Sequence, residues 1–249
     1  MSNPFTLQNK TILITGASSG IGRATAILCA EMGATLFITG RKESKLNETF
    51  TNLSGSGHQK LVLDFENEDA ITRLVAAIDQ LDGIVHSAGI VDNVPFQFIK
   101  QKALDKIFNL NLNVPLMITR DLIKKRKLHS KSSIVFLSSL VGVGKTYYGA
   151  TSYSASKGAI SSVIKVMALE MATKKIRVNS VCPGMVLTEM VDNLEAISSN
   201  QLKKDEKENY PLGYGTPEQV ANAIVFLLSD ASSWITGTNL VIDGGASIH

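Results

Sequence analysis

Short apolar runs alternate with amphipathic segments along most of the chain. The runs have the length of buried strands and predict strands over residues 11–14, 34–39, 60–63, 83–86, 133–137, 176–179 and 239–242. Between them, apolar residues recur at helical spacing and predict helices over 24–33, 43–53, 70–78, 104–125, the segment that contains Tyr153, and 217–228. Strands that alternate with helices predict an α/β fold with a doubly wound, Rossmann-like parallel sheet.

We expect a single domain over residues 1–249, because the chain contains neither an internal repeat nor a dividing linker. Ligands of doubly wound sheets bind beyond the carboxyl ends of the strands. Candidate residues follow several of the predicted strands: the glycine-rich segment 15–22, Asp64, Gly89, Ser139 and Pro183. These residues are therefore predicted to meet at one edge of the sheet.

The segment 15–22 reads Thr-Gly-Ala-Ser-Ser-Gly-Ile-Gly and joins a predicted strand to a predicted helix. Glycines let the backbone approach a pyrophosphate, and the first turn of a helix offers unpaired N–H groups and a positive dipole end. A glycine turn can also be only a tight connection. The succession of strand, turn and helix favours a dinucleotide site here.

Tyr153 and Lys157 are four residues apart and share a face of their predicted helix. An ammonium beside a phenol favours the phenolate and lowers a pKa that is normally about 10. A phenol tuned in this way can exchange a proton with a carbonyl or alcohol oxygen. Ser139 stands upstream, at the end of an apolar run. The Tyr–Lys spacing alone is common on solvated helix faces, so its meaning depends on the other motifs.

Several ordered motifs together resemble the short-chain dehydrogenase/reductase family, in its classical group, from about residue 9 to residue 245. The segment 15–22 matches the family's Thr-Gly-x-x-x-Gly-x-Gly cofactor turn. The segments 179–184, 234–237 and 243–245 match its nicotinamide-side segment and C-terminal strand region. The resemblance implies an oxidoreductase that transfers a hydride between a nicotinamide cofactor and a carbonyl or secondary alcohol.

The resemblance implies four catalytic residues, Asn111, Ser139, Tyr153 and Lys157, and no metal. Tyr153 would be the acid for carbonyl reduction and the base for alcohol oxidation, and Ser139 would hold the substrate oxygen. Lys157 would lower the pKa of Tyr153 and bind the nicotinamide ribose. Asn111 would bend its helix and hold a water that relays protons to Lys157. Without the resemblance, Asn111 would be an ordinary surface residue of its helix.

The resemblance also implies the residues of the cofactor site. They are Gly16, Ser18, Ser19, Gly20, Ile21, Gly22, Arg41, Asp64, Phe65, Ala88, Gly89, Tyr153, Lys157, Pro183, Gly184, Val186 and Thr188. Asp64 is expected to accept a hydrogen bond from the adenine amine.

The end of the second predicted strand bears on cofactor choice. Sites specific for NAD usually place a carboxylate there, on the ribose 2′-hydroxyl. Here Gly40 takes that position and is followed by Arg41 and Lys42. If Arg41 pairs with a 2′-phosphate, a charged hydrogen bond of about 1.5–3 kcal/mol corresponds to roughly 10- to 150-fold discrimination. The alternative is a solvated turn residue. We expect NADP(H), with NAD(H) less favoured.

Two segments depart from the family pattern. The chain has His86-Ser87-Ala88-Gly89 where the family commonly has Asn-Asn-Ala-Gly. Ala88 and Gly89 still allow close approach of a cofactor, and His86 is expected to be a packed strand residue. The segment 211–215 lacks an arginine that is often found there. A local interaction in each segment is therefore in doubt.

The substrate is the least defined part of the prediction. The segment from about 189 to 214 lies where the family keeps its substrate lid, and its polar run 203–208 predicts a mobile, solvated helix. The overall pattern resembles bacterial 3-oxoacyl-acyl-carrier-protein reductases. Alternatives are a reductase or dehydrogenase of a sugar, steroid or other small alcohol and, in a different class, a cofactor-sensing regulator without turnover. The four catalytic residues argue against a pure binder, which need not keep them.

A carrier protein is acidic, and two basic groups could attract it. They are Lys124, Lys125, Arg126 and Lys127 in one segment, and Lys174 and Lys175 in another. Cations also suit the C-terminal ends of helices, where the helix dipole favours them. The basic residues are therefore compatible both with a carrier-protein site and with ordinary helix ends. The family resemblance further implies a homotetramer, and an outward apolar face is expected on the helix of Tyr153. The candidates for that face are Ile160, Val163, Ile164 and Met167.

Composition excludes several classes of protein. The chain is 44% hydrophobic and 19% charged, and its net charge of +3 is too small to indicate nucleic-acid binding. Cys29 and Cys182 have no metal-like neighbours in the sequence, which predicts a reduced, cytoplasmic protein. The segment 1–10 has no apolar signal core. No apolar run approaches the roughly 18 residues of a membrane span.

Overall fold

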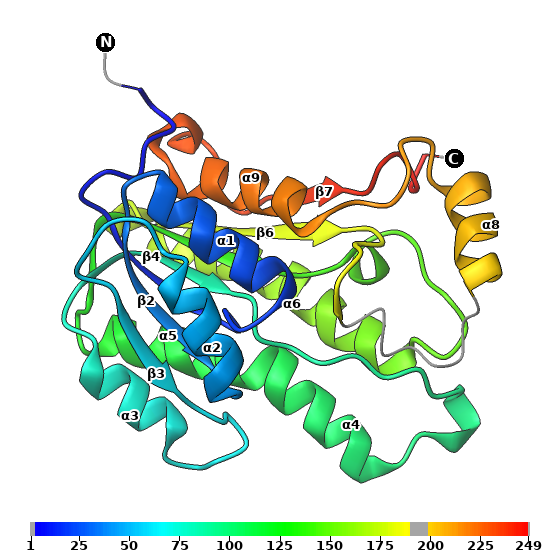
Figure 1. Ribbon diagram of the computed structural model, residues 1–249. Coiled ribbons are helices and arrows are strands. Elements are labelled where there is room, and N and C mark those ends of the chain that lie inside the picture. Colours follow the sequence, from blue (N-terminus) through cyan, green and yellow to red (C-terminus); the bar gives the residue numbers. More distant parts are fainter. Residues whose placement is uncertain (1–2, 190–198, 249) are drawn as a thin grey trace.

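The computed structural model describes residues 3–189 and 199–248. Its centre is a seven-stranded sheet with the strand order β3-β2-β1-β4-β5-β6-β7 (Figure 1). Every neighbouring pair is parallel. The order runs outward in both directions from β1 and β4, which is the doubly wound arrangement. The predicted fold class is confirmed.

Helices connect successive strands. The strands are β1 (Thr11–Thr15), β2 (Thr35–Gly40), β3 (Gln59–Val62), β4 (Leu81–His86), β5 (Leu128–Leu137), β6 (Arg177–Pro183) and β7 (Asn239–Ile242). The helices are α1 (Gly20–Glu31), α2 (Glu43–Thr51), α3 (Ala70–Ala77), α4 (Gln101–Phe108), α5 (Val114–Lys124), α6 (Thr151–Met171), α8 (Ser199–Asn209) and α9 (Pro217–Leu228). Within the described segments, none of these helices is long and apolar enough to cross a bilayer.

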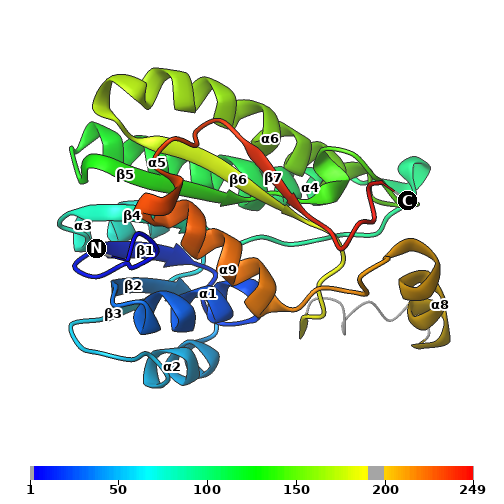
Figure 2. The same cartoon turned by 90° about the horizontal axis from the view of Figure 1, so that it is seen from above.

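The sheet separates two apolar cores. In β1, Ile12 and Ile14 enter one core and Leu13 enters the other, because successive side chains of a strand point to opposite faces. The first core is covered by α1 and α9, which pack side by side, and the second by α3, α5 and α6 (Figure 2). Each fully buried Ile or Leu side chain contributes about 1.5–3 kcal/mol. Successive residues of one strand therefore contribute to both cores.

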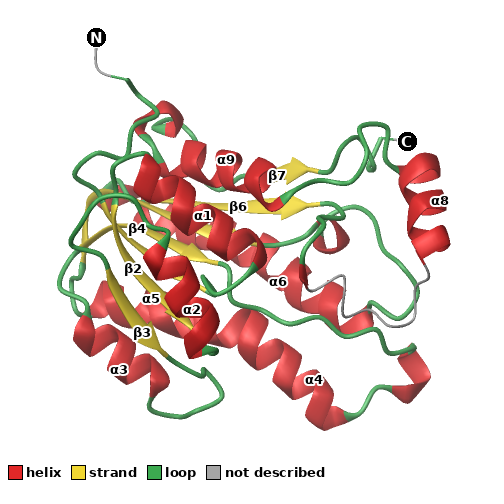
Figure 3. Cartoon of the chain, viewed as in Figure 1, coloured by secondary structure: helices red, strands yellow, loops and turns green. Residues whose placement is uncertain are grey.

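The parallel strands give the sheet two different edges. Their carboxyl ends meet on the side where α8 lies, and we call this the carboxyl edge (Figure 3). The opposite side, where the strands begin, is the amino edge. The helix expected over 203–208 is present as the middle of α8. The part of the expected lid over 190–198 lies outside the described residues.

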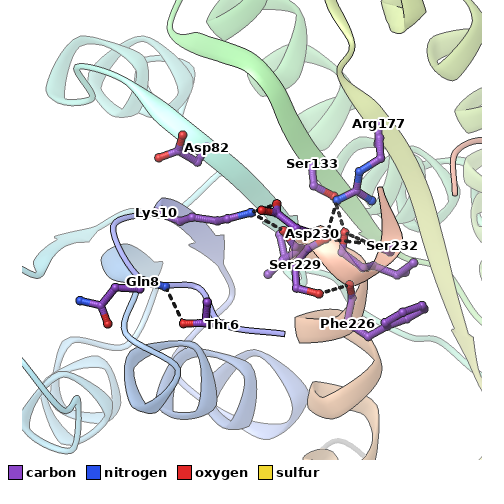
Figure 4. Close-up of polar contacts among 12 residues, drawn as sticks. Thr6, Gln8, Lys10, Asp82, Ser133, Arg177, Phe226, Ser229, Asp230 and Ser232 are labelled. Carbon is purple, nitrogen blue, oxygen red and sulfur yellow. Dashed lines mark hydrogen bonds and ion pairs between the residues drawn. The ribbon is translucent and has the colours of Figure 1, made fainter. Parts of the chain in front are cut away.

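At the amino edge, polar side chains hold the end of α9 (Figure 4). Lys10 Nζ donates to Asp230 Oδ1 at 2.7 Å and to the Leu228 carbonyl at 3.4 Å. Arg177 donates through Nη2 to the Ser229 carbonyl at 3.1 Å. The last carbonyls of a helix have no intrahelical partner, so these cations satisfy them. This edge is tied together by contacts that stabilise the fold.

The helix expected over 104–125 is one rod in three parts. It begins at Gln101 in α4, continues through the π-helical turn Asn109–Asn113 and ends in α5. A π turn inserts an extra residue into a helix, and here Asn111 is buried at its centre. Apolar residues recur at helical spacing both before and after the π turn. Because of this, the sequence pattern alone predicts one unbroken helix.

The structure corrects the apolar face expected on α6. Ile160 and Ile164 are buried in the second core, and Met167 packs against it. Val163, the fourth candidate, is partly exposed. The most exposed apolar side chains of this helix are Val166 and Leu169, which are 55% and 77% exposed. The helix carries apolar residues on more than one face, so spacing alone does not decide which face meets the sheet.

Candidate active site

The glycine turn between β1 and α1 has no room for a side chain at Gly16 or Gly22. A Cβ added at Gly16 would lie 2.7 Å from the Ala88 nitrogen, and one added at Gly22 would lie 2.2 Å from the Gly16 carbonyl oxygen. Gly16 and Gly20 have φ angles of +70° and +49°, in the left-handed region that glycine adopts most readily. The backbone is therefore bare where α1 begins.

This bare turn fits the phosphates of a dinucleotide. The N–H groups of the first turn of α1, at Gly20, Ile21 and Gly22, have no partner within the helix. The helix dipole adds partial positive charge at the same place. Ser19 is the N-cap residue, and its side chain makes no capping bond within the described chain. The backbone N–H groups and the helix dipole can hold an anion here even without help from a charged side chain.

Ser139, Tyr153 and Lys157 come together beyond the carboxyl end of β5. Lys157 Nζ donates to the Leu137 carbonyl at 2.7 Å and lies 5.7 Å from the centroid of the Tyr153 ring. The Ser139 side chain lies within reach of Tyr153 and acts on its pKa as a hydrogen-bond partner. Ser139 Oγ also accepts from the Val141 N–H at 3.2 Å. The three predicted residues therefore occupy one site.

Asn111 joins the same site through the loop after β4. A Cβ added at Gly89 would lie 3.1 Å from Asn111 Oδ1 and 3.6 Å from Lys157 Nζ. Asn111 accepts from the Ile90 N–H at 2.8 Å and donates to the Ile90 carbonyl at 2.9 Å. Its amide also donates to Ser156 Oγ at 3.1 Å. Asn111 thus fixes this loop against α6, beside Lys157.

Burial dominates the proton equilibria of the site. It raises the pKa of Tyr153, and the hydrogen bond with Ser139 opposes this rise. Burial also lowers the pKa of Lys157 to about 8, while the Cys182 thiol opposes the fall. The expected lowering of the Tyr153 pKa by Lys157 is not among the causes of its shift, which are burial and Ser139. The ammonium instead donates to the Leu137 carbonyl.

The segment after β6 crosses the glycine turn. Val186 forms an isolated bridge with Gly215 at one end of this segment. Farther along, Thr188 Cγ2 lies 3.2 Å from the position of a Cβ on Gly20. The predicted cofactor residues in 183–188 are therefore at the same edge as the glycine turn, with Thr188 directly against it.

The ends of β2 and β3 form the other corner of the predicted cofactor site. Arg41 is largely exposed, and its Nη1 lies 3.8 Å from Glu66 Oε1. Asp64 accepts through Oδ1 from the Glu66 N–H at 3.0 Å. Phe65 packs against the second core. Arg41 and Asp64 therefore lie just beyond the ends of the neighbouring strands β2 and β3 at the carboxyl edge, where an adenosine ribose could reach both.

Sequence reasoning missed two residues near Tyr153. Both carboxylate oxygens of Asp92 are buried, and burial raises the pKa of this carboxyl, against an opposing contact with Ser152. Burial raises the pKa of Tyr147 to about 12, and Tyr153 and Asp92 add to this rise. Asp92 and Tyr147 lie on loops, where no periodic pattern indicates the direction of a side chain.

His86 is a packed strand residue, as expected. Its side chain is buried, and its Nε2 lies 2.8 Å from Thr119 Oγ1. Its ring centroid is 4.7 Å from that of Phe136. Burial lowers the pKa of His86 to about 3, so the ring stays neutral near neutral pH. It is not a catalytic acid or base of this site.

The two basic groups lie at the amino edge of the sheet. Lys124 and Lys125 end α5 just before β5, and Lys174 and Lys175 precede β6. The Lys174 carbonyl accepts from Ser130 Oγ at 3.1 Å, so the two groups are close to one another. The candidate site lies at the carboxyl edge. The groups are therefore separated from this chain's own site by the length of the strands.

Known proteins resemble the chain over nearly its full length. A family model described as "Enoyl-(Acyl carrier protein) reductase" matches residues 16–247. A 3-oxoacyl-[acyl-carrier-protein] reductase of Rickettsia felis is 35% identical over 96% of this chain and 97% of its own length. A glucose 1-dehydrogenase of Gluconobacter oxydans is also 35% identical, over 96% of this chain and 92% of its own length.

A solved structure shares the fold. It is that of a putative NAD(P)-dependent gluconate 5-dehydrogenase from Beutenbergia cavernae with bound NADP at low occupancy. Its TM-score is 0.89 at 27% sequence identity, and the likeness covers 99% of this chain and 100% of that one.

Proposed function

The chain belongs to the short-chain dehydrogenase/reductase family of NAD(P)-dependent oxidoreductases, and we propose that it is an NADP(H)-dependent carbonyl reductase with Tyr153 as its proton donor. The observation that carries the proposal is the meeting of Tyr153, Ser139 and Lys157 beside the bare glycine turn. The test is NADPH oxidation with 3-oxoacyl, sugar and steroid carbonyl compounds. Cofactor binding without turnover of any of them would favour the sensing regulator.

In this proposal each side chain has one task. A bound nicotinamide would supply the hydride, and the residues of the chain would act on the carbonyl oxygen. Ser139 Oγ holds the carbonyl oxygen, and the Tyr153 hydroxyl gives its proton to the same oxygen as negative charge develops there. Lys157 would provide positive charge beside the phenol and would hold the ribose of a bound cofactor. Asn111 keeps the loop at Gly89 in place beside Lys157.

Arg41→Ala is expected to weaken NADPH binding about tenfold and NADH binding less than twofold. Only NADPH carries the 2′-phosphate. Because Arg41 is exposed, we expect an effect near the lower end of the free-energy range of a charged hydrogen bond. Fluorescence titration of both cofactors against both proteins measures it. Equal weakening of the two would show that Arg41 does not read the phosphate.

A 3-oxoacyl chain on an acyl carrier protein is the substrate we propose first. Support comes from the name of the Rickettsia felis relative and from the description of the family model. The basic groups at the amino edge can attract an acidic carrier. Between that edge and the site, β5 pairs with the six residues of β4, which corresponds to about 20 Å at the usual rise per residue.

Carrier-bound 3-oxoacyl reduction is expected to slow as ionic strength rises, because salt screens the attraction to Lys125 and Lys174. Reduction of a small uncharged ketone should change much less, since it shares the cofactor and the chemistry. The double charge reversal Lys125→Glu, Lys174→Glu should reproduce the loss at low salt. Initial rates at low and high salt measure both effects. If the two substrates respond alike, the basic residues are only solvated helix ends.

A sugar or sugar acid is the second candidate substrate. The Gluconobacter oxydans relative is as similar in sequence as the carrier-protein reductase, and its name is that of a glucose dehydrogenase. Faster turnover of a sugar than of a 3-oxoacyl thioester would favour this candidate. Either substrate would use the same four proposed catalytic residues.

A homotetramer is part of the proposal. Exposed apolar side chains that could meet other copies are Val166 and Leu169 on α6, Trp234 just before β7, and Val241 on β7. β7 is the last strand of the sheet, so its outer side has no neighbouring strand within the described chain.

A further inference from the structure

Glu189, at the end of the segment that crosses the glycine turn, lies in a cluster of cations. Its carboxylate forms an ion pair with Lys45 on α2 and lies 3.9 Å from Arg23 Nη1 on α1. Lys45 and Arg23, together with Lys42, hold the pKa of the Glu189 carboxyl below its ordinary value. An anion contributed by the chain itself therefore occupies this cluster.

The cluster adjoins the place proposed for the 2′-phosphate. A Cβ added at Gly40 would lie 2.9 Å from Ser18 Cβ, and Arg23 Nη2 donates to the Ser18 carbonyl at 2.8 Å. The end of β2 therefore contacts the glycine turn, and the turn contacts Arg23. Arg41 follows Gly40 immediately.

The helix that bears Lys45 is docked on the same turn. Thr49 Oγ1 donates to the Ala17 carbonyl at 2.9 Å and to the Lys45 carbonyl at 3.2 Å. Lys42 is the N-cap residue of this helix, and Lys45 is in its first turn, so the two cations lie within one helical turn of each other. The Lys45 ammonium can therefore reach an anion beside Arg41.

A carboxylate and a phosphate monoester compete for the same ammonium, because both bind it through charge-assisted hydrogen bonds. We propose that Lys45 is a specificity-determining residue for the 2′-phosphate of NADP(H), and that Glu189 is an internal competitor which this phosphate displaces. NAD(H) has a hydroxyl at that place and leaves the ion pair intact. The inference rests on the proposed function, since it presupposes a dinucleotide with its 2′ position at the end of β2.

The proposal predicts opposite effects on NADP⁺ affinity for substitutions of Glu189 and of Lys45. Glu189→Gln should tighten NADP⁺ about two- to fivefold, because a half-exposed ion pair no longer competes, and should leave NAD⁺ unchanged. Lys45→Met should weaken NADP⁺ by a similar factor, again without effect on NAD⁺. In the Lys45→Met background, Glu189→Gln should have no further effect. Calorimetric titration of NADP⁺, NAD⁺ and the fragment 2′,5′-ADP gives these affinities without any measurement of turnover.

Glu48→Gln is the matched control. It removes the same charge near Arg23, which Glu48 approaches at 3.5 Å from α2, but it leaves the Lys45 pair in place. The control should change neither affinity. Equal weakening of NADP⁺ and NAD⁺ by Glu189→Gln would show that the ion pair only holds the crossing segment, and would overturn the competition. An unchanged NADP⁺ affinity would overturn it as well. Failure to bind either dinucleotide would instead contradict the proposed function.

Discussion

Tyr153→Phe is expected to lower the rate of carbonyl reduction by about 10²- to 10⁴-fold, the usual contribution of a general acid. The substitution removes only the hydroxyl, and the ring keeps its place beside Lys157. NADPH should therefore bind as in the unchanged protein. Single-turnover measurement of NADPH oxidation separates the chemical step from cofactor binding.

Tyr147→Phe is the control for this substitution. Tyr147 also carries a phenol close to Tyr153, but it lies on the loop before α6 and has no Lys157 behind it. Its loss should leave the rate within a few-fold. If Tyr153→Phe retains more than about a tenth of the turnover, the proton comes from another group, and Tyr147 is the first to examine.

The fold could be predicted because its signal is local and repeated. Runs such as Ile12, Leu13 and Ile14 are apolar on both faces of a strand, and only a sheet covered on both sides buries them all. The order of strands and helices then leaves few topologies. The face of α6 could not be predicted in the same way, because several of its faces are apolar. Contact with the sheet decides that Ile160 is buried and Leu169 exposed.

The residues of the candidate site also differ in whether a local sequence pattern predicts their place. Gly16, Tyr153 and Lys157 belong to motifs with fixed spacing, so their positions in the sequence already place them on a turn or on one face of a helix. Asp92 and Glu189 belong to no spacing pattern. They meet Tyr147 and Lys45 only because distant loops cross at the carboxyl edge. Contacts of that kind depend on tertiary structure, and no local pattern predicts them.

The second large effect is expected at the glycine turn. Gly22→Ala would place a Cβ 2.2 Å from the Gly16 carbonyl oxygen and 2.8 Å from the Gly16 carbonyl carbon. Both are backbone atoms, so no side-chain rotation can relieve the contact. Overpacking typically costs about 1–3 kcal/mol, and a domain of this size loses roughly 2–4 °C of melting temperature per kcal/mol. We expect a melting temperature lower by several degrees.

Cofactor binding should suffer more than stability in Gly22→Ala. The contact can be relieved only by moving the turn away from α1, and this movement misaligns the N–H groups at Gly20 and Gly22 that would face the phosphates. We expect NADPH to bind at least about tenfold more weakly, a loss of about 1.4 kcal/mol. Thermal melting with and without NADPH measures both effects, since a bound ligand raises the melting temperature.

Gly144→Ala is the matched control for the same exchange. A Cβ at Gly144 would meet only Leu140 Cδ1 at 3.6 Å, which is an ordinary contact. Its melting temperature and the shift with NADPH should therefore stay close to those of the unchanged chain. If Gly22→Ala behaved like this control, the turn would not be the phosphate site. The succession of strand, turn and helix would then serve only to join β1 to α1, and the cofactor would have to bind elsewhere along the carboxyl edge.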